Sequence, residues 1–310
     1  MKCVRIHEFG DSDRLCAEQV ERPAPGEGEV LIAIAGAAVN PVDTKMRRGL
    51  LQAVLPINLP FVPGADFAGT IVATGPGVDE ARIGQRVMGM VDVQRGGAYA
   101  ECMTVPVERA VPVPDELDLI EAAGLPMGVM TGTDLVELGL VIKPGDKVAV
   151  TGAAGSVGRA AVFEAARQGA EVIALVRSIP QFPIAGASRV IEVADRAAMS
   201  AAAPFDCVAD TVGGEVSAEV CTLLRKGGQL ATAVGALSAP PSSPDLYSAV
   251  GVVVKPRQEA LLRFVEALSK GQATVPPVLR LPLDQAARAH DLVSAGGTGR
   301  KVVLVPGADG

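Results

Sequence analysis

One stretch of sequence decides the fold of the middle of this chain: Thr151-Gly152-Ala153-Ala154-Gly155-Ser156-Val157-Gly158. The apolar run at residues 146–151 predicts a buried strand before it, and residues 157–168 predict a helix after it. Between a strand and a helix, the first glycine permits a tight turn, the second lets backbone N–H groups approach a pyrophosphate, and the third lets the helix pack closely on the sheet. The helix N-terminus adds partial positive charge. We therefore predict that every residue from Gly152 to Gly158 binds a dinucleotide cofactor; the alternative is a turn with a purely structural role.

The tip of the next predicted strand, residues 171–176, indicates which dinucleotide binds. In chains that bind NAD, an acidic residue about twenty positions beyond the glycines accepts a hydrogen bond from the ribose 2′-hydroxyl. Here that place holds Arg177 and Ser178. A guanidinium can pair with a 2′-phosphate, and the serine hydroxyl can donate beside it. The sequence therefore predicts NADPH with both residues in its site; the alternative is that Arg177 is a solvated surface arginine.

The pattern of elements outward from this turn predicts an α/β protein with two domains. From about residue 115, an alanine-rich run at residues 117–138 predicts one helix, and strands then alternate with helices; apolar runs at residues 190–193 and 250–254 are among the predicted strands. This alternation indicates a doubly wound parallel sheet. Before residue 112, short β-rich runs separated by glycine and proline favour a compact β-barrel or sandwich-like domain. Short strands return after residue 275, and we expect this tail to rejoin the N-terminal domain. We place the β-rich domain at residues 1–122 and 269–310, with the parallel-sheet domain, residues 123–268, inserted between them.

Composition favours a small-molecule partner. The formal net charge is −7 and the basic residues are scattered, which argues against binding nucleic acid or an anionic lipid surface. No run approaches the roughly 18 uninterrupted apolar residues of a membrane span, so we expect a cytoplasmic protein without membrane association. The five cysteines form no C-x-x-C pair and match neither a disulfide framework nor a structural zinc site.

A hydrolase is the rival interpretation of the same turn. Ser156, Asp210 and His290 occur in the serine, acid, histidine order of α/β-hydrolases, and residues 154–158 are one residue away from their G-x-S-x-G elbow. His290 lies in a helix-like run, however, and a long β-rich domain precedes the serine. A serine hydrolase is therefore the least favoured function, and we expect His290 to be a structural helix residue.

Several short motifs occur in a fixed order along nearly the whole chain: Asn40-Pro41-Val42-Asp43-Thr44-Lys45, residues 62–69 (VPGADFAG), 97–101 (GAYAE), 152–158, 210–214 (DTVGG), 227–228 (GG) and 299–302 (GRKV). In this order they resemble the zinc-independent quinone oxidoreductase branch of the medium-chain dehydrogenase/reductase superfamily. The resemblance implies a GroES-like β-barrel catalytic domain with an inserted Rossmann domain. It also implies an active site in the cleft between them and a homodimer or homotetramer.

The zinc-bearing relatives differ from this chain where their metal binds. By resemblance, they place a cysteine near Asn40 or Val42, and a Gly-His-Glu where this chain has Gly64-Ala65-Asp66. The chain has two histidines, neither near these positions, so a catalytic zinc lacks its usual donors. The four closely spaced cysteines of the structural zinc lobe are missing too. We therefore predict no metal site.

The resemblance also implies the remaining site residues. Asn40 and Thr131 line the nicotinamide pocket and are the candidate catalytic residues. Cofactor-contacting residues at the ends of later strands are Thr211, Val212, Gly235 and Ala236. We expect Asp43 to organise its own loop and Tyr99 to pack beside the cleft; contact of either with substrate is left open.

From these motifs taken together, we expect an NADPH-dependent reductase that transfers hydride to a quinone or an α,β-unsaturated carbonyl compound. One alternative is an enoyl-thioester reductase, which needs a basic entrance that only Lys45, Arg47 and Arg48 can provide. Another is a non-catalytic NADPH-binding sensor or RNA-associated protein, although the acidic balance argues against RNA. Residues 179–183 lack the lysine that many relatives use beside the 2′-phosphate, so affinity for NADPH rests more heavily on Arg177.

Overall fold

The structure, a computed structural model, describes residues 1–235, 247–254 and 256–307. It contains two compact units, one of Met1–Met127 with Pro277–Gly310 and one of Gly128–Pro276. Both borders lie a few residues later than the expected 122/123 and 268/269. Contacts explain the difference, because the Met127 amide donates to Asp66 within the first unit and Arg159 donates to Thr274 within the second.

The second unit is built on a six-stranded sheet in which every pairing is parallel. Its strands are β8 (Lys147–Thr151), β9 (Glu171–Val176), β10 (Arg189–Glu192), β11 (Phe205–Asp210), β12 (Leu224–Thr232) and β13 (Tyr247–Gly251). The order β10-β9-β8-β11-β12-β13 reverses direction at β8, which confirms the expected doubly wound sheet. The last strand lies earlier than the apolar run at residues 250–254 predicts, because residues 247–251 pair with residues 228–232 of β12.

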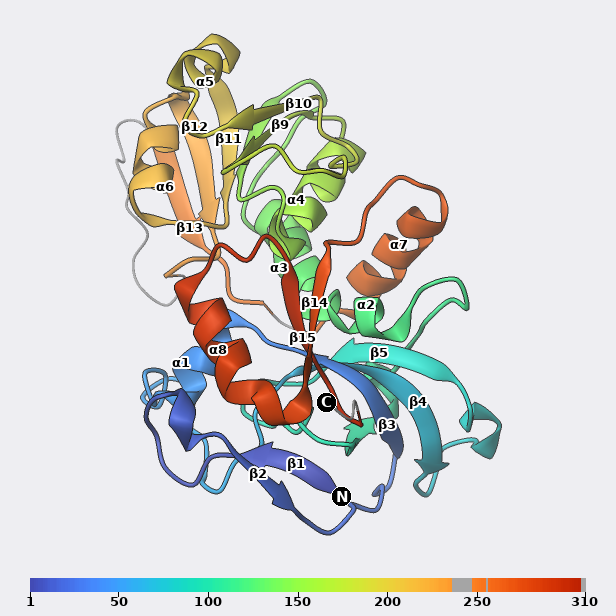
Figure 1. Ribbon diagram of the computed structural model, residues 1–310. Helices are drawn as coiled ribbons and strands as arrows, with labels where there is room; N and C mark the ends of the chain where they lie inside the picture. Colours follow the sequence, from blue (N-terminus) through green and yellow to red (C-terminus); the bar gives the residue numbers. More distant parts are fainter. Residues whose placement is uncertain (236–246, 255, 308–310) are drawn as a thin grey trace. The chain divides into compact units, whose positions relative to one another are not determined.

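Helices cover both faces of this sheet (Figure 1). They are α3 (Pro126–Glu137), α4 (Ser156–Arg167), α5 (Arg196–Ala202) and α6 (Gly214–Cys221), and α7 (Gln258–Ser269) packs on α4. Side chains alternate along the strands, so Val148 and Val150 pack with α3 and α4, while Ala149 packs with α5 and α6. Phe163 of α4 and Phe264 of α7 meet edge to face, with ring centroids 5.5 Å apart.

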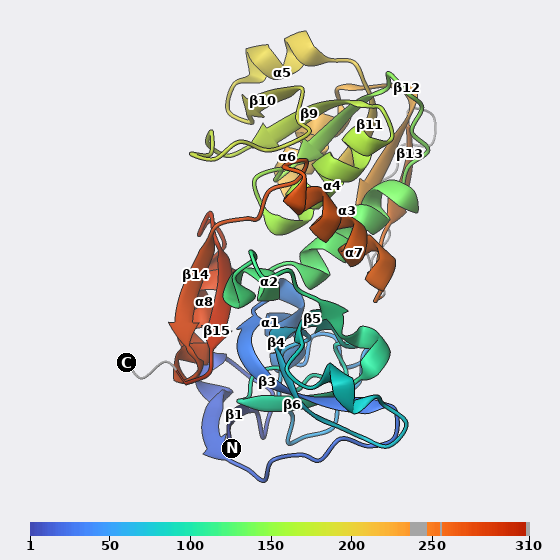
Figure 2. The same ribbon diagram turned by 90° about the vertical axis from the view of Figure 1, so that its right-hand side faces the viewer.

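The first unit is β-rich. Its strands are β1 (Lys2–Arg5), β2 (Cys16–Gln19), β3 (Glu29–Ala38), β4 (Asp66–Thr74), β5 (Arg86–Met90), β6 (Cys102–Pro106), β7 (Val111–Pro112), β14 (Val278–Pro282) and β15 (Lys301–Val305). The long strand β3 pairs with β4, with β6 near its start and with β15 near its end. Figure 2 shows β15 beside β3, which confirms that the C-terminal tail rejoins the N-terminal domain.

Three α-helices occur in the described part of the first unit: α1 (Pro41–Arg47), α2 (Leu119–Ala123) and α8 (Ala286–Ala295). The continuous helix expected over residues 117–138 is broken, because α2 ends at Ala123 and a new helix starts at Pro126, where proline is favoured as a first helical residue. Among the described residues, no helix combines the length and the apolar character needed to cross a bilayer.

Candidate functional site

The glycine-rich turn joins β8 to α4 as a tight cradle. Gly152 has φ +61°, and a Cβ there would lie 2.4 Å from Thr211 Oγ1. A Cβ on Gly158 would lie 2.3 Å from the carbonyl oxygen of Gly152, so α4 packs directly on the turn. A Cβ on Gly155 would meet nothing within 4 Å except Gly152 O, at 3.3 Å. Since the first amides of a helix have no intrahelical acceptor, this open side fits an anionic group such as a pyrophosphate.

Asp210 at the end of β11 ties the carboxyl ends of three strands together. Its Oδ1 accepts from Thr151 Oγ1 at 2.7 Å and from the Val212 and Gly213 amides at 3.2 and 3.1 Å. Its Oδ2 accepts from Thr232 Oγ1 at 2.8 Å. The carboxylate is buried. This bonding fixes the edge of the sheet where ligands bind in doubly wound folds.

The residues predicted after β11 lie beside the turn. Thr211 Oγ1 donates to Thr151 O at 2.7 Å, and Val212 is 46% exposed at the same edge. Gly235 follows β12 and is also exposed. Ala236 lies outside the described residues. The structure therefore brings Thr211 and Val212 to Gly152, while contact of any of these residues with a cofactor stays a prediction.

Arg177 and Ser178 are exposed at the tip of β9. Among the described residues, Arg177 makes no hydrogen bond or ion pair, so its guanidinium is free to bind a ligand. The next residue, Ile179, donates its amide to Glu192 Oε1 at 3.0 Å. Sequence reasoning missed Glu192, although its place at the end of the predicted strand at residues 190–193 puts it at this edge. Its carboxylate holds the start of the segment that leaves β9.

Thr131 lies in α3, which packs against the first turn of α4. A Cβ on Gly132 would lie 2.3 Å from Val157 O, so the two helices touch through backbone. Thr131 is 8% exposed. Asn40 belongs to the other compact unit. The pocket that the two residues are expected to share therefore stays a prediction.

Asn40 lies between β3 and α1 at the centre of a polar cluster inside the first unit. Its Nδ2 donates to Asp66 Oδ2 at 3.0 Å, and its Oδ1 accepts from Lys301 Nζ. Its backbone amide donates to Asp43 Oδ2 at 2.8 Å, so Asp43 organises this loop as expected. Asn40, Asp43 and Asp66 are buried. Both polar atoms of the Asn40 side chain, Nδ2 and Oδ1, therefore have hydrogen-bond partners.

The ionisable side chains of this cluster, Asp43, Asp66 and Lys301, influence one another's pKa values. Burial raises the pKa of Asp43 to about 7 and that of Asp66 to about 6, while the Lys301 ammonium opposes both shifts. Burial also lowers the pKa of Lys301. Sequence reasoning placed Asp66 and Lys301 in motifs but not in the site. The only local signal was a lysine at the start of an otherwise apolar strand.

Tyr99 extends the same cluster and is wholly buried. Its Oη lies 3.4 Å from Asp43 Oδ2 and 3.1 Å from His290 Nε2. Burial, with the nearby Arg47 charge, lowers the pKa of His290 to about 3, so the imidazole is neutral at pH 7. A neutral His290 with its proton on Nε2 donates to Tyr99, whose hydroxyl can then donate to Asp43.

These contacts argue against the hydrolase. His290 is a buried residue of α8, as expected, and its ring packs edge to face on Tyr99 with centroids 5.6 Å apart. Asp210 already accepts from Thr151, Thr232 and two amides. Ser156 and Asp210 lie in the second unit, and no hydrogen bond between its described residues joins them.

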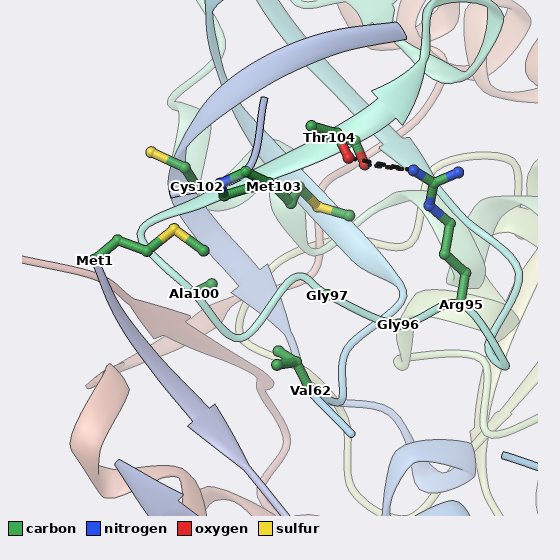
Figure 3. Close-up of a pocket in the computed structure, with 10 residues that line it drawn as sticks. Met1, Val62, Arg95, Gly96, Gly97, Ala100, Cys102, Met103 and Thr104 are labelled. Atoms are coloured by element: carbon green, nitrogen blue, oxygen red, sulfur yellow. Dashed lines mark hydrogen bonds between the residues drawn. The ribbon is translucent and has the colours of Figure 1, made fainter. Parts of the chain in front are cut away.

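A separate hollow of about 220 Å³ lies on the first unit (Figure 3). Met1, Val62 and Met103 line it, with Arg95 at one side donating to Thr104 O at 3.0 Å. None of the predicted site residues lines this hollow. It is therefore not the candidate site. The described residues also contain no group of three or more His, Cys, Asp or Glu side chains that could hold a metal ion.

Two family models match the chain: an alcohol dehydrogenase GroES-like domain at residues 26–115 and a zinc-binding dehydrogenase at residues 185–304. The chain is 28% identical to the quinone oxidoreductase of Rattus norvegicus over 98% of each protein. It is also 28% identical to an NADPH-dependent alkenal/one oxidoreductase of Arabidopsis thaliana, over 99% of this chain and 80% of that protein. Its structure is similar to that of the quinone oxidoreductase from Coxiella burnetii, with a TM-score of 0.84 and 26% identity over 98% of this chain and 99% of that one.

Shorter matches reach higher identity. Several relatives are 32% to 34% identical, and in these matches the chain spans about half the length of the curated relative.

Proposed function

The chain belongs to the medium-chain dehydrogenase/reductase superfamily, and from that premise we propose that it is a zinc-independent, NADPH-dependent reductase of quinones or α,β-unsaturated carbonyl compounds. The observation that carries the proposal is the glycine cradle at the end of β8, with the exposed guanidinium of Arg177 at the tip of the neighbouring strand β9. The partner is a small molecule, and the assembly is a homodimer or homotetramer.

The chain's own residues bind and orient in this proposal. The turn from Gly152 to Gly158 and the N-terminus of α4 hold the pyrophosphate, while Arg177 and Ser178 hold the 2′-phosphate. Thr211, Val212, Gly235 and Ala236 border the rest of the cofactor. NADPH, when bound, supplies the hydride. Asn40 and Thr131 shape the pocket in which the nicotinamide and the acceptor are held at reacting distance.

The proposed class of acceptor follows from how readily the titratable side chains near Asn40 can donate a proton. His290 is neutral and wholly buried, and Tyr99 has no exposed surface. Burial raises the pKa of Tyr99 well above its usual value, which makes it a poor source of protons. An acceptor that needs little protein-assisted protonation, such as a quinone or an enone, suits such a site better than a simple ketone. Water can protonate the product.

Hydride transfer is tested with NADPH that carries deuterium at the transferred position. We expect the label in the reduced quinone or enone, with loss of NADPH absorbance across an acceptor panel. Ser156→Ala should keep most activity, whereas Asn40→Ala should lose about 10-fold or more, since misplacement of a bound reactant is costly. An Asn40→Ala variant with normal turnover would remove Asn40 from the proposal. Ester hydrolysis that is lost in Ser156→Ala would point to a hydrolase instead.

Independence from zinc is tested by metal removal. After extended dialysis against a chelator, we expect unchanged melting temperature and unchanged turnover, because the zinc-ligand positions of the relatives hold Asn40, Val42 and Ala65. Elemental analysis before and after treatment is the control. Stoichiometric zinc that leaves together with activity would contradict this prediction.

The enoyl-thioester alternative loses support from the fold. Of its three candidate basic residues, Arg47 is 3% exposed and donates Nε to Gly10 O at 3.2 Å, so it cannot form an entrance. Lys45 and Arg48 remain exposed. A non-catalytic NADPH sensor or an RNA-associated protein is separated from a reductase by the same acceptor panel, run beside a nucleic-acid binding assay at stated salt.

A further inference from the structure

A buried arginine without an acidic partner lies under the glycine-rich turn. Arg159, in the first turn of α4, is 3% exposed. Its Nε donates to Ala154 O at 3.0 Å, and its Nη1 donates to Pro183 O at 2.9 Å and to Thr274 Oγ1. All three acceptors are neutral. Among the described residues, no carboxylate pairs with Arg159, and its Nη2 has no partner.

A buried guanidinium without an acidic partner lowers the stability of the folded protein. Burying a guanidinium without an anion loses its hydration and gains no counter-charge in return. Burial lowers the pKa of Arg159, and no acidic group opposes that shift. Arg167, in the last turn of the same helix, shows the usual arrangement, because it pairs with Glu164. The contrast indicates that the anion for Arg159 comes from outside the chain.

The contacts of Arg159 also show where that anion binds. Ala154 belongs to the turn, and Pro183 belongs to the segment that leaves β9 just after Arg177 and Ser178. In doubly wound folds the adenosine ribose lies between these two segments. Arg159 therefore connects the two segments that border the expected ribose site, and among the described residues both N–H groups of its Nη2 are left without a protein partner.

We propose that Arg159 is a second cationic residue of the 2′-phosphate site. It supplies positive charge from α4, in addition to that of Arg177, and it holds the segment around Pro183 against the turn. In this proposal, the charge of Arg159 compensates for the absence of a lysine at residues 179–183. The proposal rests on NADPH as the cofactor.

The experiment compares two variants with a matched control. Arg159→Met keeps the length of the side chain without charge, Arg159→Lys keeps the charge, and Arg167→Met removes a cation from the far end of the same helix. Dissociation constants for NADPH and NADH are measured by titration calorimetry, with melting temperatures as a check of folding. We expect Arg159→Met to weaken NADPH about 10-fold or more and NADH less than about 3-fold. Arg159→Lys should keep most of the preference for NADPH, and Arg167→Met should keep all of it.

The outcomes separate this proposal from the cofactor assignment. A parent chain without preference for NADPH would overturn the cofactor assignment itself. A parent chain that prefers NADPH, with the same preference in Arg159→Met, would overturn the role of Arg159 alone, and so would equal weakening of both cofactors. If Arg159→Met does not fold, Arg159→Lys decides: a retained preference supports the charge, and parallel loss of NADPH and NADH binding shows a structural bridge only.

Discussion

Replacing Arg177 by alanine is expected to weaken NADPH binding by about 10- to 150-fold and to leave NADH binding almost unchanged. A charge-assisted contact contributes roughly 1.5 to 3 kcal/mol, which converts to that range of dissociation constants. Arg177 can deliver this contribution because its guanidinium is exposed at the tip of β9 and makes no competing ion pair among the described residues. The loss should appear in binding titrations as a change in the NADPH-to-NADH ratio.

The control is Arg189→Ala, which removes an exposed arginine from the opposite end of the neighbouring strand β10. It should leave the ratio unchanged, since the 2′-phosphate site lies at the carboxyl ends of the strands. Equal weakening of NADPH and NADH in Arg177→Ala would mean that the residue does not discriminate the 2′-phosphate.

Replacing Lys301 by methionine is expected to lower the free energy of unfolding by about 2 to 3 kcal/mol at pH 8 and much less at pH 5. The ammonium of Lys301 lowers the pKa values of Asp43 and Asp66 against the effect of burial. Without it, both pKa values rise further, so at pH 8 each carboxyl is either charged with no nearby cation or protonated at a cost in free energy. At pH 5 both carry protons, because their pKa values in the folded protein are about 7 and 6.

The sign of the pH dependence follows from these shifts. A carboxyl whose folded pKa is raised above its unfolded pKa of 3.8 adds stability that is present below pH 4 and is lost as pH rises through 6 to 7. His290 acts in the opposite direction, because its pKa falls from 6.5 to about 3 and its contribution is lost as pH falls. Its effect cancels in the difference between Lys301→Met and the parent.

Urea denaturation at several pH values measures this difference. Lys2→Met is the control, because Lys2 pairs with Asp284 at the surface and should contribute less than about 1 kcal/mol. Adding Asp66→Asn to Lys301→Met should recover part of the lost stability at pH 8, since one uncompensated charge is removed. A destabilisation by Lys301→Met that is the same at pH 5 and pH 8 would refute the electrostatic account.

The sequence by itself determined the features that depend on local conformation and burial. The glycines at positions 152 and 158 had to be glycine because of a positive φ and a backbone contact, and this requirement is visible in the chain. The alternation of apolar strands and helices specified the parallel sheet, and the place of Arg177 followed from the end of β9. The break at Pro126 was also readable, but the alanine-rich composition around it favoured one helix.

Only the tertiary structure decided which distant residues meet. Lys301 reaches Asn40 across 261 positions of sequence because β15 pairs with the end of β3 in one particular register. Arg159 contacts Thr274 across 115 positions of sequence. No motif in the sequence around either residue predicts this contact. The local sequence reflects the backbone conformation that a residue must adopt and whether its side chain is buried or exposed. The pairing of buried charges depends instead on strand register and helix packing, which many distant residues determine together.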